Sequence, residues 1–274
     1  MPPKSPKCIF MATYTLADKV VIITGASQGI GAEVAKQAAR AGARVVLASR
    51  RIERLKALED EIRAAGGEAC AIPTDVRVRS EVTNLVKATI DHWGRLDVLF
   101  NNAGLSYDEP LLKMDPQKVH EEMEVNLLGL IDCAQAVVKR MLMQRSGHIV
   151  NMASIAGLIG LPGNTIYNAS KWGVVGFSEG LNREVSRYGV RVSAFCPGFV
   201  ATDFSPRLKA IKENLAGAAK VPGVMSVGYV GRQALWLMQH PRRRYIIPHS
   251  WTILVWAAQT FPWGADWIIP HFIK

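Results

Sequence analysis

The stretch Lys19-Val-Val-Ile-Ile-Thr24-Gly25-Ala-Ser-Gln-Gly29-Ile-Gly31 decides the fold class of this chain. Its first half is a β-branched run, which predicts a strand buried on both faces. Its second half places three glycines in the pattern G-x-x-x-G-x-G, and a helical pattern follows through Ala41. A strand, a glycine turn and a helix form a phosphate site, because the N–H groups and the dipole of the helix face the anion. The stretch therefore predicts a nucleotide-binding turn, although a glycine trio on its own also occurs in plain turns.

Strands and helices alternate along the rest of the chain. Further strands are predicted at residues 44–49, 68–74, 97–101, 147–154 and 191–196, with helices between them at residues 53–65, 79–93, 116–144 and 165–188. This alternation predicts an α/β fold with a doubly wound, mostly parallel sheet and helices on both faces. Ligands of such sheets bind beyond the carboxyl ends of the strands. We therefore expect the site among the polar residues that follow those ends.

The second strand ends in Ser49-Arg50-Arg51. Enzymes that use the non-phosphorylated nicotinamide cofactor place an acidic residue near this point to hold the ribose hydroxyls. A guanidinium instead pairs with a 2′-phosphate, which a carboxylate would repel. The sequence therefore favours NADP(H), and solvated arginines at a strand–helix turn are the plain alternative.

Two further strand ends carry polar residues. Asp75 follows the third strand, where its carboxylate either hydrogen-bonds an adenine amino group or starts the next turn. Asn101 and Asn102 end the fourth strand, and adjacent amides at a buried strand end also satisfy backbone groups of neighbouring strands. Their role is therefore as much structural as directed to a cofactor.

Tyr167 and Lys171 are four residues apart in the helix predicted at 165–188. This spacing puts them on one face, where the ammonium is expected to lower the pKa of the phenol from its usual value near ~10. Ser154 ends the fifth strand and supplies a hydroxyl to the same oxygen. Although such a pair also occurs on solvated helix faces, the three side chains predict a proton-transfer site for a carbonyl/alcohol couple. Asn126, an amide in apolar surroundings, needs a hydrogen-bond partner, and we expect it to hold a water that joins Lys171 to solvent.

These motifs jointly resemble the short-chain dehydrogenase/reductase family over residues 17–240, in the order and spacing of that family. The matching pieces are Thr24-Gly25-Ala-Ser-Gln-Gly29-Ile-Gly31, Asp75, Asn101-Asn-Ala-Gly104, Asn126, Ser154, Tyr167-x-x-x-Lys171 and Pro197-Gly198 with Thr202. The resemblance implies a Rossmann-type fold and an NADP(H)-dependent oxidoreductase that interconverts a ketone or aldehyde and an alcohol. It implies no metal.

The resemblance also implies roles. Tyr167 exchanges the proton, Ser154 orients the substrate oxygen, Lys171 holds the nicotinamide ribose, and Asn126 supports the proton relay. The cofactor shell is expected to contain Gly25, Ser27, Gln28, Gly29, Ile30, Gly31, Ser49, Arg50, Arg51, Asp75, Val76, Asn102, Ala103, Gly104, Tyr167, Lys171, Pro197, Gly198, Val200 and Thr202. Within this shell, Asp75 faces the adenine and Thr202 fixes the carboxamide.

The end of the chain departs from the family, whose members often finish with a strand, a glycine-rich turn and a short tail. Here an apolar segment follows instead, with Trp251, Leu254, Val255 and Ala258 at helical spacing, which predicts a helix at 250–260 and a second short one at 263–269. Prolines interrupt the uncharged stretch and argue against a membrane-spanning helix. Four tryptophans beside a basic triplet are typical of a membrane interface, whereas an amphipathic helix more often packs on protein. We expect packing on this chain or on a second subunit, with peripheral membrane contact as the alternative.

Length and composition indicate a globular protein. The 274 residues are 49% hydrophobic and 20% charged, which suffices for a core and argues against disorder. We expect a disordered tail at residues 1–16, a catalytic domain at 17–248 and a helical extension at 249–274. The loop at 203–225 varies with substrate in the family, and its apolar residues favour a 3-oxoacyl, lipid-like or steroid-like carbonyl compound. We also expect a homodimer or homotetramer formed through the two longest helices.

Cysteine content and charge limit the partners. Cys70, Cys133 and Cys196 lie in apolar runs without metal or disulfide spacing, so we expect reduced core residues of a cytoplasmic protein. The formal charge is +10, and the nine basic and three acidic residues after residue 198 contribute +6 of it. Such basicity suits an anionic membrane surface, a phosphorylated ligand or nucleic acid, but no nucleic-acid motif accompanies it. The competing function is a catalytically silent, membrane-associated binding or scaffold protein of the same fold.

Overall fold

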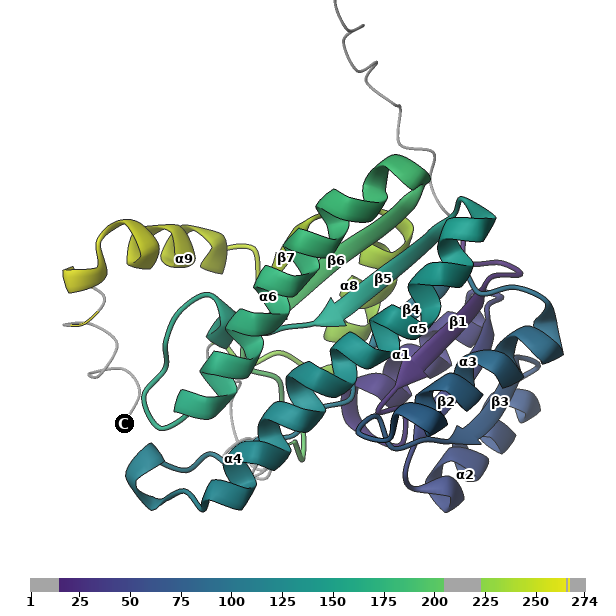
Figure 1. The fold of residues 1–274 in the computed structure, drawn as a ribbon, viewed down its shortest axis with the longest axis horizontal. Helices are drawn as coiled ribbons and strands as arrows, with labels where there is room; N and C mark the ends of the chain where they lie inside the picture. Colours follow the sequence, from purple (N-terminus) through teal and green to yellow (C-terminus); the bar gives the residue numbers. More distant parts are fainter. Residues whose placement is uncertain (1–14, 205–222, 265, 267–274) are drawn as a thin grey trace, which may run out of the picture.

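The computed structural model describes residues 15–204, 223–264 and 266. Most of the expected N-terminal tail and of the loop at 203–225 lie outside these residues, as does the end of the second C-terminal helix. The described strands form one parallel sheet in the order β3-β2-β1-β4-β5-β6-β7 (Figure 1). They are β1 (Val20–Thr24), β2 (Arg44–Ser49), β3 (Glu68–Pro73), β4 (Val98–Asn101), β5 (Gly147–Met152), β6 (Val190–Pro197) and β7 (Arg244–Ile247).

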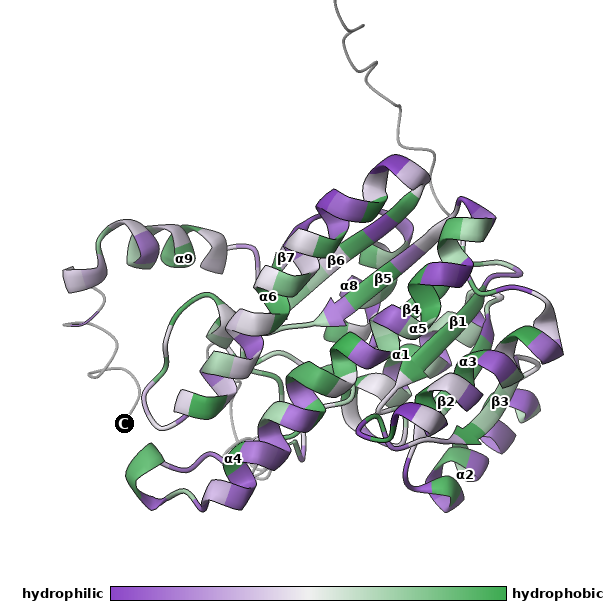
Figure 2. Cartoon of the chain, in the orientation of Figure 1, coloured by the Kyte–Doolittle hydropathy of each residue, from purple (hydrophilic) through white to green (hydrophobic). Residues whose placement is uncertain are grey.

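Helices cover both faces of this sheet. Alternate residues of β1 enter two separate cores: Val21 and Ile23 pack on one face, and Val20 and Ile22 pack on the other. The first face is covered by α1 (Gly29–Arg40), α2 (Ile52–Ala64) and α8 (Val227–Gln239), and the second by α3 (Arg79–Trp93), α5 (Gly129–Gln144) and α6 (Thr165–Val185). Strand β1, at the centre of the sheet, is correspondingly green in Figure 2. The predicted doubly wound α/β fold is confirmed.

The helical region predicted at 116–144 is not one uninterrupted helix. It consists of α4 (Pro116–Met123), a π-helical segment (Glu124–Leu128) and α5. The π segment contains Asn126, which is fully buried. Single π turns inside helices are frequent at functional sites, and this one sets the direction of an amide that the sequence had already singled out.

Strand β7 corrects the expectation that this chain does not add a final strand to its sheet. Arg244–Ile247 pairs in parallel with the end of β6, with Ala194 opposite Arg244. Only three apolar residues carry this strand, which is too few to show a period along the sequence. Beyond it, α9 (Trp251–Thr260) confirms the helix predicted at 250–260.

Helix α9 packs through one side only. Val255 is buried, and the Trp251 ring meets the Phe199 ring at 5.9 Å between centroids. Ile253, Trp256 and Trp263 are exposed by 72%, 61% and 75%. The helix projects sideways from the body of the molecule (Figure 1). Internal packing therefore covers only part of its apolar surface. None of the described helices has the length and hydrophobicity to span a membrane.

Buried polar groups in the sheet are satisfied locally. His148 in β5 has its Nε2 atom 2.8 Å from Ser193 Oγ and its Nδ1 atom 3.3 Å from the Met238 carbonyl oxygen. Burial lowers the pKa of this imidazole to about 4. Cys133 and Cys196 are buried, Cys70 is half-buried, and all three are free thiols.

His148 makes the stability of the fold depend on pH. The unfolded side chain titrates near ~6.5, so the unfolded chain binds this proton first, and stability present above that pH is lost as the pH falls toward 4. Between about pH 7.5 and about pH 5 the wild type should lose about 2 kcal/mol through this group. In His148→Gln this component should be absent, as measured by urea unfolding at both pH values. The exposed His92→Gln serves as the control, and an equal pH dependence in wild type and His148→Gln would refute the assignment.

Candidate active site

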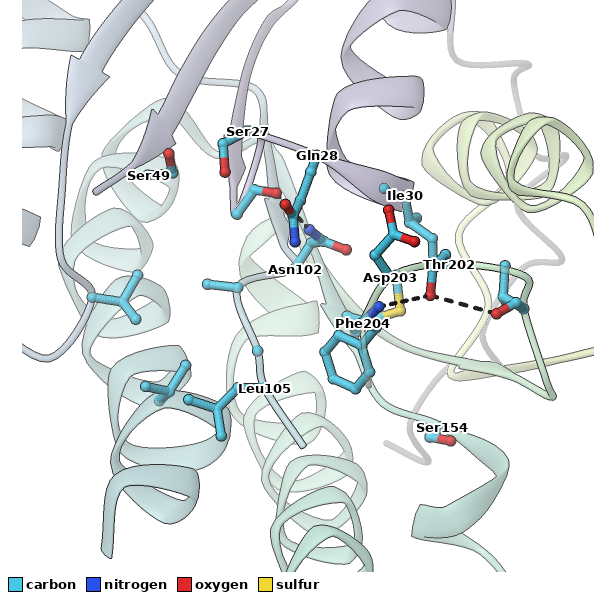
Figure 3. Close-up of a pocket in the computed structure, with 18 of the residues that line it drawn as sticks. Ser27, Gln28, Ile30, Ser49, Asn102, Leu105, Ser154, Thr202, Asp203 and Phe204 are labelled. Carbon is cyan, nitrogen blue, oxygen red and sulfur yellow. Dashed lines mark hydrogen bonds between the residues drawn. The ribbon is translucent and has the colours of Figure 1, made fainter. Parts of the chain in front are cut away.

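A cavity opens beyond the carboxyl ends of β1 and β4, the neighbouring strands at which the chain order of the sheet reverses. All predicted site residues except Gly31 and Asn126 line it. Figure 3 shows Ser27 and Gln28 at one end and Ser154 at the other, with Thr202 and Phe204 along the wall between them. Asp203 and Phe204, from the loop expected to vary with substrate, also line the cavity. The sequence did not single out the remaining lining residues, namely Thr74, Leu105, Val125, Met152 and Ala153.

The glycine turn is built for close approach of backbone to a ligand. Gly25 and Gly29 have φ values of +65° and +59°, a region that side chains disfavour. Above Gly29 the nearest atom to an added Cβ is Thr202 Cγ2 at 3.9 Å, so the first turn of α1 faces open space. Gly31 lies behind the lining, where a Cβ would stand 2.4 Å from the Gly25 carbonyl oxygen. The turn and the start of α1 thus fit a bound pyrophosphate.

Thr24 joins the ends of β1 and β4. Its hydroxyl oxygen accepts hydrogen bonds from the backbone N–H of Asn102 at 2.9 Å and of Ala103 at 3.0 Å. Asn102 Nδ2 donates to the Thr24 carbonyl oxygen at 3.0 Å, and Asn101 Nδ2 donates to Asn151 Oδ1 at 3.2 Å. These bonds confirm that the two asparagines have the predicted structural role, since they tie the ends of neighbouring strands together at the base of the cavity.

Arginines gather around the turn that follows β2. Arg51 and Arg54 each donate from Nη1 to Gln28 Oε1 at 2.7 Å, and Arg50 Nη1 lies 4.0 Å from Asp75 Oδ2. Arg54 was not predicted, but its place three residues after Arg51, the residue that precedes α2, was a usable signal. The cluster makes this end of the cavity positive, as a phosphorylated ligand requires.

Asp75 is held by a neighbour that the sequence reasoning missed. Arg77 donates from Nη2 to Asp75 Oδ2 at 2.6 Å and from its backbone N–H to Oδ1 at 3.0 Å. The guanidinium lowers the pKa of the carboxyl. Asp75 therefore starts the turn before α3, as its alternative reading held, and remains an ionised acceptor on the cavity wall.

Tyr167, Lys171 and Ser154 converge at the other end of the cavity. Lys171 is buried, its Nζ donates to the Met152 carbonyl oxygen at 2.9 Å and lies 5.5 Å from the centre of the Tyr167 ring. The Tyr167 hydroxyl is hydrogen-bonded to Ser154. Phe204 meets the tyrosine ring edge-on at 5.9 Å between centroids. The predicted grouping of phenol, ammonium and hydroxyl is present.

The expected direction of the tyrosine pKa is wrong. Desolvation raises the pKa of Tyr167, the charges of Glu122 and Asp108 add to the rise, and only the Ser154 bond opposes it. Desolvation also lowers the pKa of Lys171 to about 8. The spacing in the sequence shows that an ammonium is near enough to favour the phenolate. It does not show that the phenolate would lose its surrounding water. Tyr167 is consequently a neutral phenol, a proton donor.

Asn126 supports the cavity from behind. Its Oδ1 accepts from Leu105 N–H at 2.8 Å, and its Nδ2 donates to the Leu105 carbonyl oxygen at 2.8 Å and to Ser170 Oγ at 3.3 Å. The expectation that this amide is fully hydrogen-bonded is confirmed. The proton relay assigned to it stays a prediction.

Comparison with known proteins places this site in a family. A family model described as short chain dehydrogenase matches residues 19–213, most of the chain. The chain belongs to the short-chain dehydrogenase family. A 3-oxoacyl-acyl-carrier-protein reductase of Synechocystis sp. is 42% identical to this family member over 196 residues, which cover 71% of this chain and 79% of the relative. The corresponding FabG reductase of Staphylococcus aureus strain Mu50 is 37% identical over 199 residues, covering 72% and 81%.

Two solved short-chain dehydrogenase structures share the fold over most of their length. One, from Burkholderia phymatum in complex with NAD, has a TM-score of 0.81 at 29% identity and covers 90% of this chain and 95% of its own. The other, a metagenomic short-chain oxidoreductase in complex with NADP, has a TM-score of 0.72 at 30% identity and covers 85% and 98%. Members of this short-chain dehydrogenase fold are thus solved with either nucleotide.

The close packing behind the glycine turn predicts the effect of adding one methyl group there. A Cβ on Gly31 would lie 2.4 Å from the Gly25 carbonyl oxygen and 2.7 Å from Asn102 Nδ2, so Gly31→Ala should destabilise the fold by about 2 kcal/mol and abolish nucleotide binding. Gly176→Ala in α6, where an added Cβ meets nothing within 4 Å, should instead stabilise it by roughly 0.5–1 kcal/mol. Thermal melts and NADPH fluorescence titrations of both variants measure this. Equal behaviour of the two alanines would contradict the packing argument.

Proposed function

We propose that the protein is an NADP(H)-dependent oxidoreductase that interconverts a ketone or aldehyde and an alcohol. The convergence of Ser154, Tyr167 and Lys171 at one end of a cavity carries this proposal, because the other end offers a glycine turn and the start of a helix. The reductases among its relatives support the same reaction class. The alternative of a catalytically silent scaffold protein finds no support, since all three reacting side chains are in place.

The cofactor shell follows from the residues that line the cavity. The turn at residues 25–31 and the first N–H groups of α1 would hold the pyrophosphate. Arg50 and Arg51 would pair with the 2′-phosphate, and Asp75 would accept from the adenine amino group. Because the two solved relatives hold NAD and NADP respectively, the preference for NADP(H) rests on these arginines and on the lack of an acid at the end of β2. When bound, the nicotinamide supplies or accepts the hydride.

The protein's own residues move the proton. In the reducing direction the neutral Tyr167 donates its proton to the carbonyl oxygen, which Ser154 orients by a hydrogen bond. Lys171, desolvated and held by the Met152 carbonyl, stabilises the phenolate that this transfer leaves. A proton then returns to Tyr167 along a path that passes Lys171, and Asn126 supports that path.

The reacting end of the cavity favours an apolar substrate. Phe204 packs edge-on against the Tyr167 ring, and Leu105, Val125 and Met152 add further apolar side chains to the cavity wall. This lining suits a 3-oxoacyl, lipid-like or steroid-like chain beside the carbonyl, and the names of the relatives favour the 3-oxoacyl class. The remaining residues of the loop at 203–225 lie outside the described chain.

The exposed side of α9 and the long helices provide surfaces for assembly. We propose at least a homodimer through α5 and α6, with the exposed Trp256 and Trp263 buried against a second subunit, and keep an anionic membrane surface as the other candidate. Velocity sedimentation with and without anionic vesicles separates the two.

Removal of the phenol oxygen tests the acid. Tyr167→Phe keeps the ring but removes the proton donor, so kcat for NADPH-dependent reduction of an acetoacetyl thioester should fall by about 10²–10⁴-fold. The NADPH dissociation constant should stay at its wild-type value. Tyr188→Phe, at an exposed tyrosine, should leave both quantities unchanged. Wild-type turnover in Tyr167→Phe would rule out the assigned role.

Reversal of one charge tests the cofactor preference. Arg50→Asp should weaken NADPH binding by about 10²-fold and change NADH binding little, because a carboxylate repels a 2′-phosphate and accepts from ribose hydroxyls. Lys56→Asp makes the same charge change on α2 away from the cavity and should affect both cofactors alike. Dissociation constants from fluorescence titration decide the matter, and equal losses for NADPH and NADH in Arg50→Asp would refute the phosphate contact.

A further inference from the structure

Glu122 on α4 is a buried carboxylate without an evident role. It is 1% exposed, and its Oε1 atom has no hydrogen-bond partner among the residues that the structure describes. The backbone N–H of Tyr107 donates a hydrogen bond to its carboxylate. A carboxylate that is buried and half unsatisfied costs stability unless a charge nearby compensates it. The surroundings of Glu122 show which charge that is.

Glu122 and Asn126 stand on successive turns and hold the same loop. Asn126 binds Leu105 at both backbone atoms, and Glu122 binds the N–H of Tyr107 two residues later. The loop passes between these residues and α6: a Cβ on Gly104 would lie 3.1 Å from Asn126 Oδ1 and 3.7 Å from Lys171 Nζ. Helix α4, which carries the buried Glu122, also packs against α6, which carries the buried Lys171.

Lys171 is the cation whose charge acts on this carboxylate. Its ammonium is buried and donates a hydrogen bond to the Met152 carbonyl oxygen. The favourable charge that acts most strongly on Lys171 is that of Glu122, and Lys171 is in turn the cation that acts on Glu122. Two buried opposite charges without direct contact stabilise each other strongly, because little water screens them.

We propose that Glu122 is a positioning residue for the proton transfer, the buried counter-charge that keeps Lys171 an ammonium while it pins the loop after β4. This rests on the proposed function, since Lys171 acts there on the phenolate of Tyr167. Glu122 touches neither substrate nor cofactor in this scheme and works through the lysine.

The groups that face Glu122 define the pH range of this pairing. Lys171 and Tyr167 face it from α6, and Asp108 and the Tyr107 backbone face it from the loop. Desolvation raises the pKa of Glu122 to about 7, with Asp108 adding to the rise and Lys171 opposing it. Desolvation lowers the pKa of Lys171 to about 8. Carboxylate and ammonium therefore coexist mainly between these two values, and removal of the carboxylate charge should make the ammonium lose its proton at lower pH.

The first experiment reads Glu122 directly and needs no substrate. Infrared difference spectra of the full chain, wild type minus Glu122→Gln, report the protonated carboxyl group as a function of pH. In Lys171→Met the midpoint of this band should move to higher pH, because the ammonium that opposes the rise in the pKa of Glu122 is gone. An unmoved midpoint overturns the proposal.

The second experiment reads the effect on Lys171. In the pH profile of kcat with NADPH and an acetoacetyl thioester, Glu122→Gln should move the alkaline limb down by about one pH unit, the scale of one nearby buried charge. Glu122→Asp should restore the limb toward wild type, and Glu124→Gln on the exposed side of the same segment should leave it in place. An unmoved limb in Glu122→Gln overturns the proposal.

The two readouts separate failure of this inference from failure of the proposed function. If the wild-type chain reduces no carbonyl probe, the proposed function falls while the infrared titration still decides whether Glu122 is the counter-charge. If Glu122→Gln shows no melting transition and is therefore unfolded, the kinetic comparison uses Glu122→Asp alone. An alkaline limb at the wild-type pH in Glu122→Asp supports the proposal, because this variant retains the negative charge.

Discussion

The parallel register of β1, β4 and β5 determines where every functional group of this protein lies. Ile23 pairs with Phe100 and Asn101 pairs with Asn151, so the three strands end at one edge of the sheet. At that edge the turn after β1, the loop after β4 and the serine after β5 share one cavity. The helices add the rest: α1 presents its first turn to the cavity, and α6 brings Tyr167 and Lys171 across the ends of the strands. A change of register by one residue would separate these groups and reverse the faces of the strands.

Desolvation rather than pairwise attraction sets the chemistry at the reacting end. Burial favours the neutral forms of both Tyr167 and Lys171, because it raises the pKa of the phenol and lowers the pKa of the ammonium. A neutral phenol beside a marginal ammonium suits proton donation to a carbonyl oxygen. Negative charge from Glu122 partly restores the ammonium and further disfavours the phenolate. The same carboxylate therefore raises the pKa of both groups, which keeps the phenol and the ammonium protonated.

The sequence was sufficient for the fold and for nearly all of the cavity lining. Long β-branched runs such as β1, and glycines and amides at strand ends, carry local signals that need no knowledge of distant contacts. The features that the sequence did not predict depend mostly on contacts between residues that are far apart in the chain. Strand β7 is too short for a period and forms because β6 offers an open edge. Arg77 becomes relevant through its pairing with Asp75, and Glu122 through burial against α6, which no spacing along the chain reveals. The sign of the tyrosine pKa failed for the same reason, since burial is a property of the packed structure.

The contact between Trp251 and Gly198 connects helix α9 to the cavity. Gly198 lines the cavity, and a Cβ there would stand 2.9 Å from the indole ring at the start of α9. The indole thus supports the cavity wall from behind. It belongs to a helix whose outer side is not covered by the described chain. A displacement of α9 would move this ring and, with it, the part of the cavity wall that Gly198 forms.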